Sequence, residues 1–256
     1  MAFDPDNSGH PASVPPSYNQ PVFHAPRRFV PVAVYGLIAS NVLIFLLTGL
    51  GGGFMDTDSE TLRRYGMLSA PDIWQGAWWR LATSMFLHAG VLHLGVNMWA
   101  LKNLGEALED MYGTPTFLVL YIGAGWTGSL ASLMFTGMSV GASGAIFGLA
   151  GAWLAIALRR RAYFKAFGSQ VLMVIGINLA IGLSMSGIDN YAHLGGLLGG
   201  FLLGCALPNS LPEFKAGWRW PAALLLLVLF GALTPLAVHF SRLHLGSIFG
   251  LPGEIG

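Results

Sequence analysis

The sequence has very little charge. Of its 256 residues, 10% are charged and 54% are hydrophobic, whereas a soluble domain has about 25% charged residues. The mean hydropathy is +0.61. A chain this apolar cannot cover a water-facing surface, so we expect lipid to be its main solvent. The net charge of +1 provides no basic surface for phosphates, which excludes nucleic acid as a partner.

The sequence also has only one cysteine and no secretion signal. Cys205 lies in an apolar run without partners for an intrachain disulfide or a metal site, so we interpret it as a helix-packing residue. Residues 1–28 are polar and rich in proline, and they lack the apolar region of a signal peptide. Their composition predicts a disordered tail. Without targeting segments, we expect the inner (plasma) membrane of a bacterial cell.

Seven apolar runs are predicted to cross the membrane as helices. They are residues 30–50, 91–108, 116–135, 142–158, 171–185, 191–207 and 221–240. Between the first two, residues 51–88 mix charges with tryptophans, a pattern typical of structure that lies at the membrane interface. The sequence therefore predicts an all-α polytopic membrane protein.

Basic residues indicate the orientation of these spans, because short cytoplasmic loops are enriched in Lys and Arg. They cluster at residues 27–28, at 159–165, and at 215 and 219. Four and then two spans separate these places, so all three fall on one side. We therefore expect a cytoplasmic N-terminus and an external C-terminus. The second, fourth and sixth spans then share an external end, and these ends carry His93, Asn97, Ser143 and His193.

Ser143 and His193 are candidates for nucleophile and general base. A serine hydroxyl is a poor nucleophile at neutral pH unless a positioned base accepts its proton. Glycines 141 and 144 flank Ser143 and let a helix begin there, whose free N–H groups can receive an oxyanion. Glycine stripes follow both residues and would let the two helices approach closely: Gly144 and Gly148 in one, Gly196, Gly200 and Gly204 in the other.

The surroundings of this pair can also be predicted. No acidic residue is placed to complete a triad, because Asp189 is expected in a loop, so a dyad is favoured. Phe147 lies one turn after Ser143 and could pack on the imidazole or simply fill the core. His93 and Asn97 are spaced i, i+4 and share a helix face, from which both could donate to an oxyanion.

These motifs together resemble the rhomboid family of intramembrane serine proteases. The match covers roughly residues 30–207. Its motifs are His88-x4-His93-x3-Asn97, Gly141-Ala142-Ser143-Gly144, Ala192-His193-x2-Gly196-x3-Gly200, Trp79-Arg80, and Leu104-Gly105 with Glu109 and Gly113. Where some relatives have Tyr, this chain has Phe147. The resemblance implies a six-helix catalytic core over residues 29–207. Residues 208–256 would add a linker, a seventh helix and a short external tail.

The resemblance also implies roles for single residues. Ser143 and His193 would form the dyad, and His93, Asn97 and the Ser143 amide would stabilise the oxyanion, in a cavity open to the external or periplasmic side. Neither a metal nor another cofactor would be needed. Substrates would be single-span or polytopic membrane proteins in the bilayer. Supporting roles would fall to Gly141, Gly144, Phe147 and Gly196, and structural roles to Trp79, Arg80, His88 and Glu109.

Three other functions fit the sequence less well. A metalloprotease is disfavoured because the sequence has no His-Glu-x-x-His motif, and His88 and His93 are five positions apart. A transporter or channel would also place polar residues in spans, but here they gather at the external ends and no acidic residue lies deep in spans three to six. A non-catalytic rhomboid-like binding protein is disfavoured because all four candidate site residues are present.

Overall fold

The computed structural model describes residues 29–159, 187–210 and 219–250, with isolated positions between 162 and 176 and Gly217. The helices described below belong to one compact unit that begins at Pro31. The predicted tail over residues 1–28 lies outside the described residues. So do most of the predicted fifth span and part of the basic block at 159–165.

Six long helices follow the predicted spans. They are α1 (Val32–Gly52), α5 (Val91–Tyr112), α6 (Thr114–Phe135), α7 (Ser143–Arg159), α10 (Asn190–Ala206) and α11 (Arg219–Leu245). Among the described residues, α1, α6 and α11 are long and apolar enough to cross a membrane. A fourth candidate is the pair Arg80–Phe86 and Val91–Tyr112, which is bent by 94°. The prediction of a mostly helical, multi-pass membrane protein is confirmed.

The remaining long helices differ from ordinary spans for physical reasons. At 1.5 Å per residue, the 17 residues of α7 and of α10 each extend about 26 Å, less than the ~30 Å hydrocarbon core. Helix α5 is long enough but carries Lys102, Glu106 and Asp110, which lower its hydropathy.

The segment between α1 and α5 contains short elements. They are α2 (Ser59–Tyr65), β1 (Leu68–Ser69), α3 (Ala70–Trp74), α4 (Arg80–Thr83) and the 3-10 helix η1 (Ser84–Phe86). Strand β1 pairs antiparallel with β2 (Met138–Ser139), directly before α7. This segment, called the external segment below after its predicted side of the membrane, is thereby joined to the chain that leads into Ser143.

Ion pairs hold the external segment in shape. Asp72 accepts hydrogen bonds from Arg63 at 2.8 and 2.7 Å and lies 3.3 Å from the Arg80 guanidinium. Arg80 also donates to the backbone carbonyls of Arg63 and Met67, at 2.7 and 2.9 Å. The guanidinium of Arg80, at the start of α4, is thus hydrogen-bonded to the end of α2.

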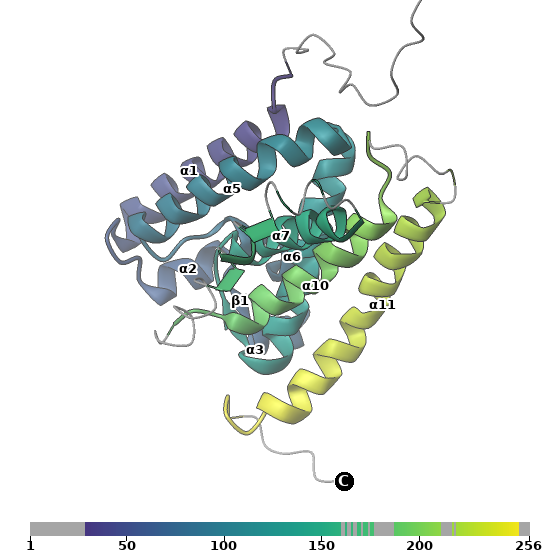
Figure 1. Ribbon diagram of the computed structural model, residues 1–256. Helices are drawn as coiled ribbons and strands as arrows, with labels where there is room; N and C mark the ends of the chain where they lie inside the picture. Colours follow the sequence, from purple (N-terminus) through teal and green to yellow (C-terminus); the bar gives the residue numbers. More distant parts are fainter. Residues whose placement is uncertain are drawn as a thin grey trace, which may run out of the picture. The chain divides into compact units, whose positions relative to one another are not determined.

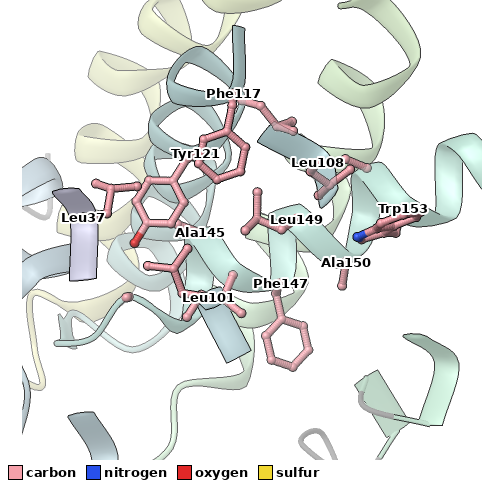
Figure 2. Packing of buried hydrophobic residues seen from close by; sticks show 14 of the residues in the cluster. Leu37, Leu101, Leu108, Phe117, Tyr121, Ala145, Phe147, Leu149, Ala150 and Trp153 are labelled. Carbon is pink, nitrogen blue, oxygen red and sulfur yellow. The ribbon is translucent and has the colours of Figure 1, made fainter. Parts of the chain in front are cut away.

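Helices α6, α7 and α10 pack against one another, α5 lies beside α1, and α11 lies against α6 (Figure 1). Most of α7 is buried. Figure 2 shows Leu149 of α7 near Phe117 and Tyr121 of α6 and Leu108 of α5, and all four belong to one hydrophobic cluster. This packing fixes α7, the helix that begins at Ser143.

Buried polar contacts attach the outer helices. The Glu109 carboxylate, fully buried in α5, accepts hydrogen bonds from the backbone N–H groups of Ala33 and Val34, both at 2.9 Å. It therefore caps α1, whose first N–H groups have no partner within the helix. Helix α11 is attached to the external segment through Trp74, whose indole N–H donates to Ser241 Oγ at 2.9 Å and whose carbonyl accepts from Arg242 at 2.8 Å.

Candidate active site

Ser143 and His193 lie within hydrogen-bonding distance of each other. Ser143 Oγ is 3.0 Å from His193 Nε2, and His193 is only 5% exposed. Ser143 is the first residue of α7, and His193 lies at the end of the first turn of α10. This geometry allows the imidazole to accept the hydroxyl proton, the first requirement for a serine nucleophile.

Gly141 makes the turn that brings the chain from β2 into α7. Its φ of +122° lies in a region that favours glycine. A Cβ atom built there would lie 2.8 Å from His93 Nε2 and 3.7 Å from Ser143 Oγ. Gly141 is therefore needed both for the turn and for the approach of His93 to residues 140–142, which lead into Ser143 and are called the serine loop below. Its N–H donates to the Ser84 carbonyl at 2.9 Å, which ties this loop to η1.

The predicted contact between the two glycine stripes is present. A Cβ atom at Gly196 would overlap the carbonyl oxygen of Gly144, and one at Gly200 would overlap the carbonyl of Gly148. Only residues without side chains allow α7 and α10 to approach this closely. The close contact begins one residue after Ser143 and three residues after His193, so it sets the distance between them.

The phenyl ring of Phe147 stacks on the imidazole of His193, with ring centroids 4.2 Å apart. Of the two interpretations of Phe147, the contact with the imidazole is therefore observed, and the side chain is buried as well. The other imidazole nitrogen, Nδ1, is buried and has no hydrogen-bond partner among the described residues. No acidic third member is therefore seen in that part of the chain.

His93 and Asn97 lie on α5, as predicted. The ring of His93 approaches the serine loop at Gly141. Asn97 is 5% exposed, and its Nδ2 donates to the His93 carbonyl at 2.8 Å. A primary amide has a second N–H, so this contact leaves one donor for another acceptor.

The residues predicted to be structural have different surroundings. His88 is fully buried and packs edge-on against the His93 ring, with centroids 5.1 Å apart. Arg80 and Glu109 make the contacts described above. Trp79 is 62% exposed, and its Nε1 has no hydrogen-bond partner within the described ranges, so a role at the membrane interface fits it better than one in the core.

The role of one residue near His193 was not predicted from the sequence. Asp189 lies outside α10, as expected, and its side chain also caps this helix by accepting from the N–H groups of Tyr191 and Ala192. The pattern that could have indicated this is an Asp directly before an apolar helical run.

A described apolar cavity lies away from Ser143, and no cluster of metal ligands is seen among the described residues. In the described ranges, no three His, Cys, Asp or Glu side chains converge as they would around a metal ion. A cavity of about 440 Å³ lies between α6 and α11, with an apolar lining that includes Ile122, Trp126 and Phe230. None of the candidate site residues lines it.

Comparisons with known proteins match this chain to one domain family and to several relatives. A model of the Rhomboid domain matches residues 75–210. Rhomboid protease GluP of Bacillus subtilis (strain 168) is 45% identical over 202 residues, which cover 78% of this chain and 39% of that protein. RHOMBOID-like protein 6, mitochondrial, of Arabidopsis thaliana is 41% identical over 172 residues, or 65% of this chain and 55% of the relative.

The chain thus spans only 39% and 55% of the lengths of these two relatives. Another B. subtilis protein, YdcA, named as a candidate rhomboid protease, is 33% identical over 180 residues, which cover 69% of this chain and 88% of that protein. The domain match includes His93, Asn97, Ser143 and His193. The chain belongs to the rhomboid family.

Proposed function

We propose that this protein is an intramembrane serine endopeptidase. It would hydrolyse a peptide bond in or next to the transmembrane segment of single-span or polytopic membrane-protein substrates. The observation that carries the proposal is the 3.0 Å distance between Ser143 Oγ and His193 Nε2. The family and the name of the relative GluP, a rhomboid protease, support the same reaction.

The reaction would proceed through an acyl-enzyme. His193 Nε2 accepts the hydroxyl proton while Ser143 Oγ bonds to the substrate carbonyl carbon. The imidazolium then returns this proton to the leaving amine as the peptide C–N bond breaks, which leaves an ester on Ser143. In the second half, His193 deprotonates a water that attacks the ester, and the proton returns to Ser143 Oγ. Every proton is accounted for by the dyad, so the steps require neither metal nor cofactor.

The oxyanion would be stabilised by three groups around Ser143. The first hydrogen bond of α7 runs from Ile146 N–H to the Ala142 carbonyl, so the Ser143 N–H has no partner within the helix. His93 approaches the serine loop at Gly141, and Asn97 retains one free N–H. One such donor typically contributes about 2.7–4 kcal/mol to transition-state stabilisation.

The site would open to the external or periplasmic side of the inner membrane. We expect six spans over residues 29–207 and a seventh after residue 208, with the N-terminus and the basic clusters on the cytoplasmic side, because short cytoplasmic loops are enriched in Lys and Arg. The length of α7 supports a buried site. A helix of about 26 Å that ends near the cytoplasmic surface begins a few ångströms below the outer edge of a ~30 Å hydrocarbon core. Ser143 is at that beginning.

Proteolysis by the purified protein tests the proposal. In detergent with a chelator present, the wild-type chain should cleave a fluorescent single-span substrate, and a fluorophosphonate should label it at Ser143. Ser143→Ala and His193→Ala should abolish cleavage. Ser139→Ala is the matched control, because Ser139 lies in β2 only four residues away and has no proposed role. Substrate binding without cleavage by the wild type would favour a binding protein instead.

A further inference from the structure

Asp189 occupies the junction between the end of α6 and the start of α10. One carboxylate oxygen, Oδ1, accepts hydrogen bonds from the N–H groups of Tyr191 and Ala192, at 3.1 and 3.0 Å. The first N–H groups of a helix have no partner within it. A single oxygen of Asp189 therefore satisfies two of the four such groups of α10.

The second carboxylate oxygen reaches a different helix. Asp189 Oδ2 accepts from Thr136 Oγ1 at 3.1 Å, and Thr136 directly follows α6. Ser132 Oγ lies 3.0 Å from the same hydroxyl. Thr136 Oγ1 also lies 2.9 Å from the Ser132 carbonyl oxygen. A threonine hydroxyl has one hydrogen and can also accept, so Thr136 shares its hydrogen between that carbonyl and Asp189, while Ser132 Oγ can donate to Thr136. The carboxylate thus joins the end of α6 to the first turn of α10.

The same turn carries His193. The backbone carbonyl of Asp189 accepts the His193 N–H at 3.2 Å, so Asp189 holds this turn through its side chain and through its main chain. The position of the turn sets where the imidazole meets Ser143. Displacements of about 1 Å at a reacting group can lower rates about 10²-fold. A loosened turn would therefore affect catalysis without touching the imidazole itself.

We propose that Asp189 is a positioning residue that clamps the first turn of α10 to the end of α6 and thereby holds His193 against Ser143. This inference rests on the proposed protease function. Asp189 acts through the backbone. It is not the third member of a triad, because the contacts of its carboxylate are with Tyr191, Ala192 and Thr136.

An amide can replace the carboxylate in this clamp. Asn is about as good an N-cap as Asp, whereas Ala lacks the acceptor. The Asn amide also offers an N–H that can donate to the hydroxyl oxygen of Thr136. Asp189→Asn should therefore keep kcat within about 3-fold of wild type. Asp189→Ala should lower kcat about 10–100-fold with KM changed less than about 2-fold, and Thr136→Val should fall between them.

Asp58 provides a matched control. It caps α2 by the same chemistry, with Oδ1 accepting the Thr61 N–H at 2.8 Å, but it is in the external segment. Asp58→Ala should lower the melting temperature about as much as Asp189→Ala and leave kcat near wild type. Hydrogen exchange followed by mass spectrometry should show faster exchange at residues 190–193 in Asp189→Ala only.

The outcomes separate the two proposals. Wild-type kcat in Asp189→Ala, unchanged exchange at residues 190–193, or equal damage by Asn and Ala would each overturn the clamp. Equal damage would mean that the charge of Asp189 acts instead of its hydrogen bonds. If the wild type neither cleaved substrate nor reacted with a fluorophosphonate, the protease proposal would fail, and hydrogen exchange would still decide whether Asp189 clamps the turn.

Discussion

Phe147 and His193 lie face to face, with ring planes inclined by only 4° and centroids 4.2 Å apart. Phe147 follows Ser143 by one turn of α7, so a single helix contacts the imidazole both through the hydroxyl and through the phenyl ring. A flat contact restrains rotation of the imidazole and keeps Nε2 directed at Ser143 Oγ.

This stacking can be tested by three substitutions. Phe147→Tyr keeps the ring and should retain near wild-type kcat. Phe147→Leu keeps much of the volume but loses the flat contact, and it should lower kcat several-fold. Phe147→Ala also leaves a cavity, which typically costs about 3–5 kcal/mol of stability, so its melting temperature should fall as well. Wild-type kcat in Phe147→Leu would show that the ring serves only to fill the core.

Asn97 is expected to act in the transition state. Asn97→Ala should lower kcat about 10²–10³-fold with little change in KM, because the oxyanion exists only after attack. Asn103 is the matched control on the same helix, since its Nδ2 donates to the Trp99 carbonyl at 2.7 Å with the same i−4 spacing. Asn103→Ala should leave kcat unchanged. A change confined to KM in Asn97→Ala would assign Asn97 to substrate binding.

The contact between α7 and α10 should not tolerate a methyl group. Gly196→Ala would push its Cβ into the Gly144 carbonyl oxygen, and overpacking of this kind typically costs about 1–3 kcal/mol. Cleavage should fall too, because His193 moves away from Ser143. Gly231→Ala is the control, since a Cβ there meets no atom within 4 Å, and in a helix it should be neutral or slightly stabilising. Thermal unfolding in detergent measures the stability of both variants.

Glu109 should matter for stability because its two oxygens hold the start of α1. Glu109→Gln replaces one acceptor by a donor that faces a backbone N–H, and a buried unsatisfied group costs about 1–3 kcal/mol. Glu106→Gln is the control: Glu106 accepts from Tyr35 Oη at an exposed site, where a single contact contributes little. Equal melting temperatures for the two variants would contradict the capping role.

The Arg63–Asp72 pair predicts a loss of stability in acid. The hydrogen bond from Arg63 is the main cause that lowers the pKa of Asp72 from 3.8 to about 2. Because the folded-state pKa lies below the unfolded one, the pair stabilises the fold fully above about pH 4, and this contribution is lost as the pH falls toward 2. Asp72→Asn should flatten the decrease in melting temperature over this range. An equal decrease in melting temperature between pH 4 and pH 2 in wild type and Asp72→Asn would contradict a stabilising role for the Arg63–Asp72 pair.

Much of the catalytic region could be predicted from the sequence because its determinants are local. Gly141, the glycine stripes, and the i, i+4 spacing of His93 and Asn97 each constrain one helix or one turn. The contacts that were missed join separate elements: Thr136 with Asp189, 53 residues apart, and Arg63 with Asp72, nine residues apart. The cap of α10 by Asp189 is a local pattern, but its bond to Thr136 depends on where α6 ends in space, and hydropathy does not contain that information.

The number of membrane spans is also hard to predict from length and hydropathy alone. Helices α7 and α10 are rich in glycine and pack mainly on protein, so they can be short. A length criterion therefore identifies α1, α6 and α11 more readily than the helices that carry Ser143 and His193.

The hydrogen bond between Trp74 and Ser241 joins positions 167 residues apart, which has a consequence for biosynthesis. At about 5–20 residues per second, a ribosome needs roughly 8–33 s after making Trp74 before its partner exists. The contacts between the external segment and α11 therefore wait for almost the whole chain, whereas the pairing of β1 with β2 does not. A nascent chain halted before α11 would carry the complete Ser143–His193 pair without the contacts of Trp74 to Ser241 and Arg242, and α11 is in this sense the last step of maturation.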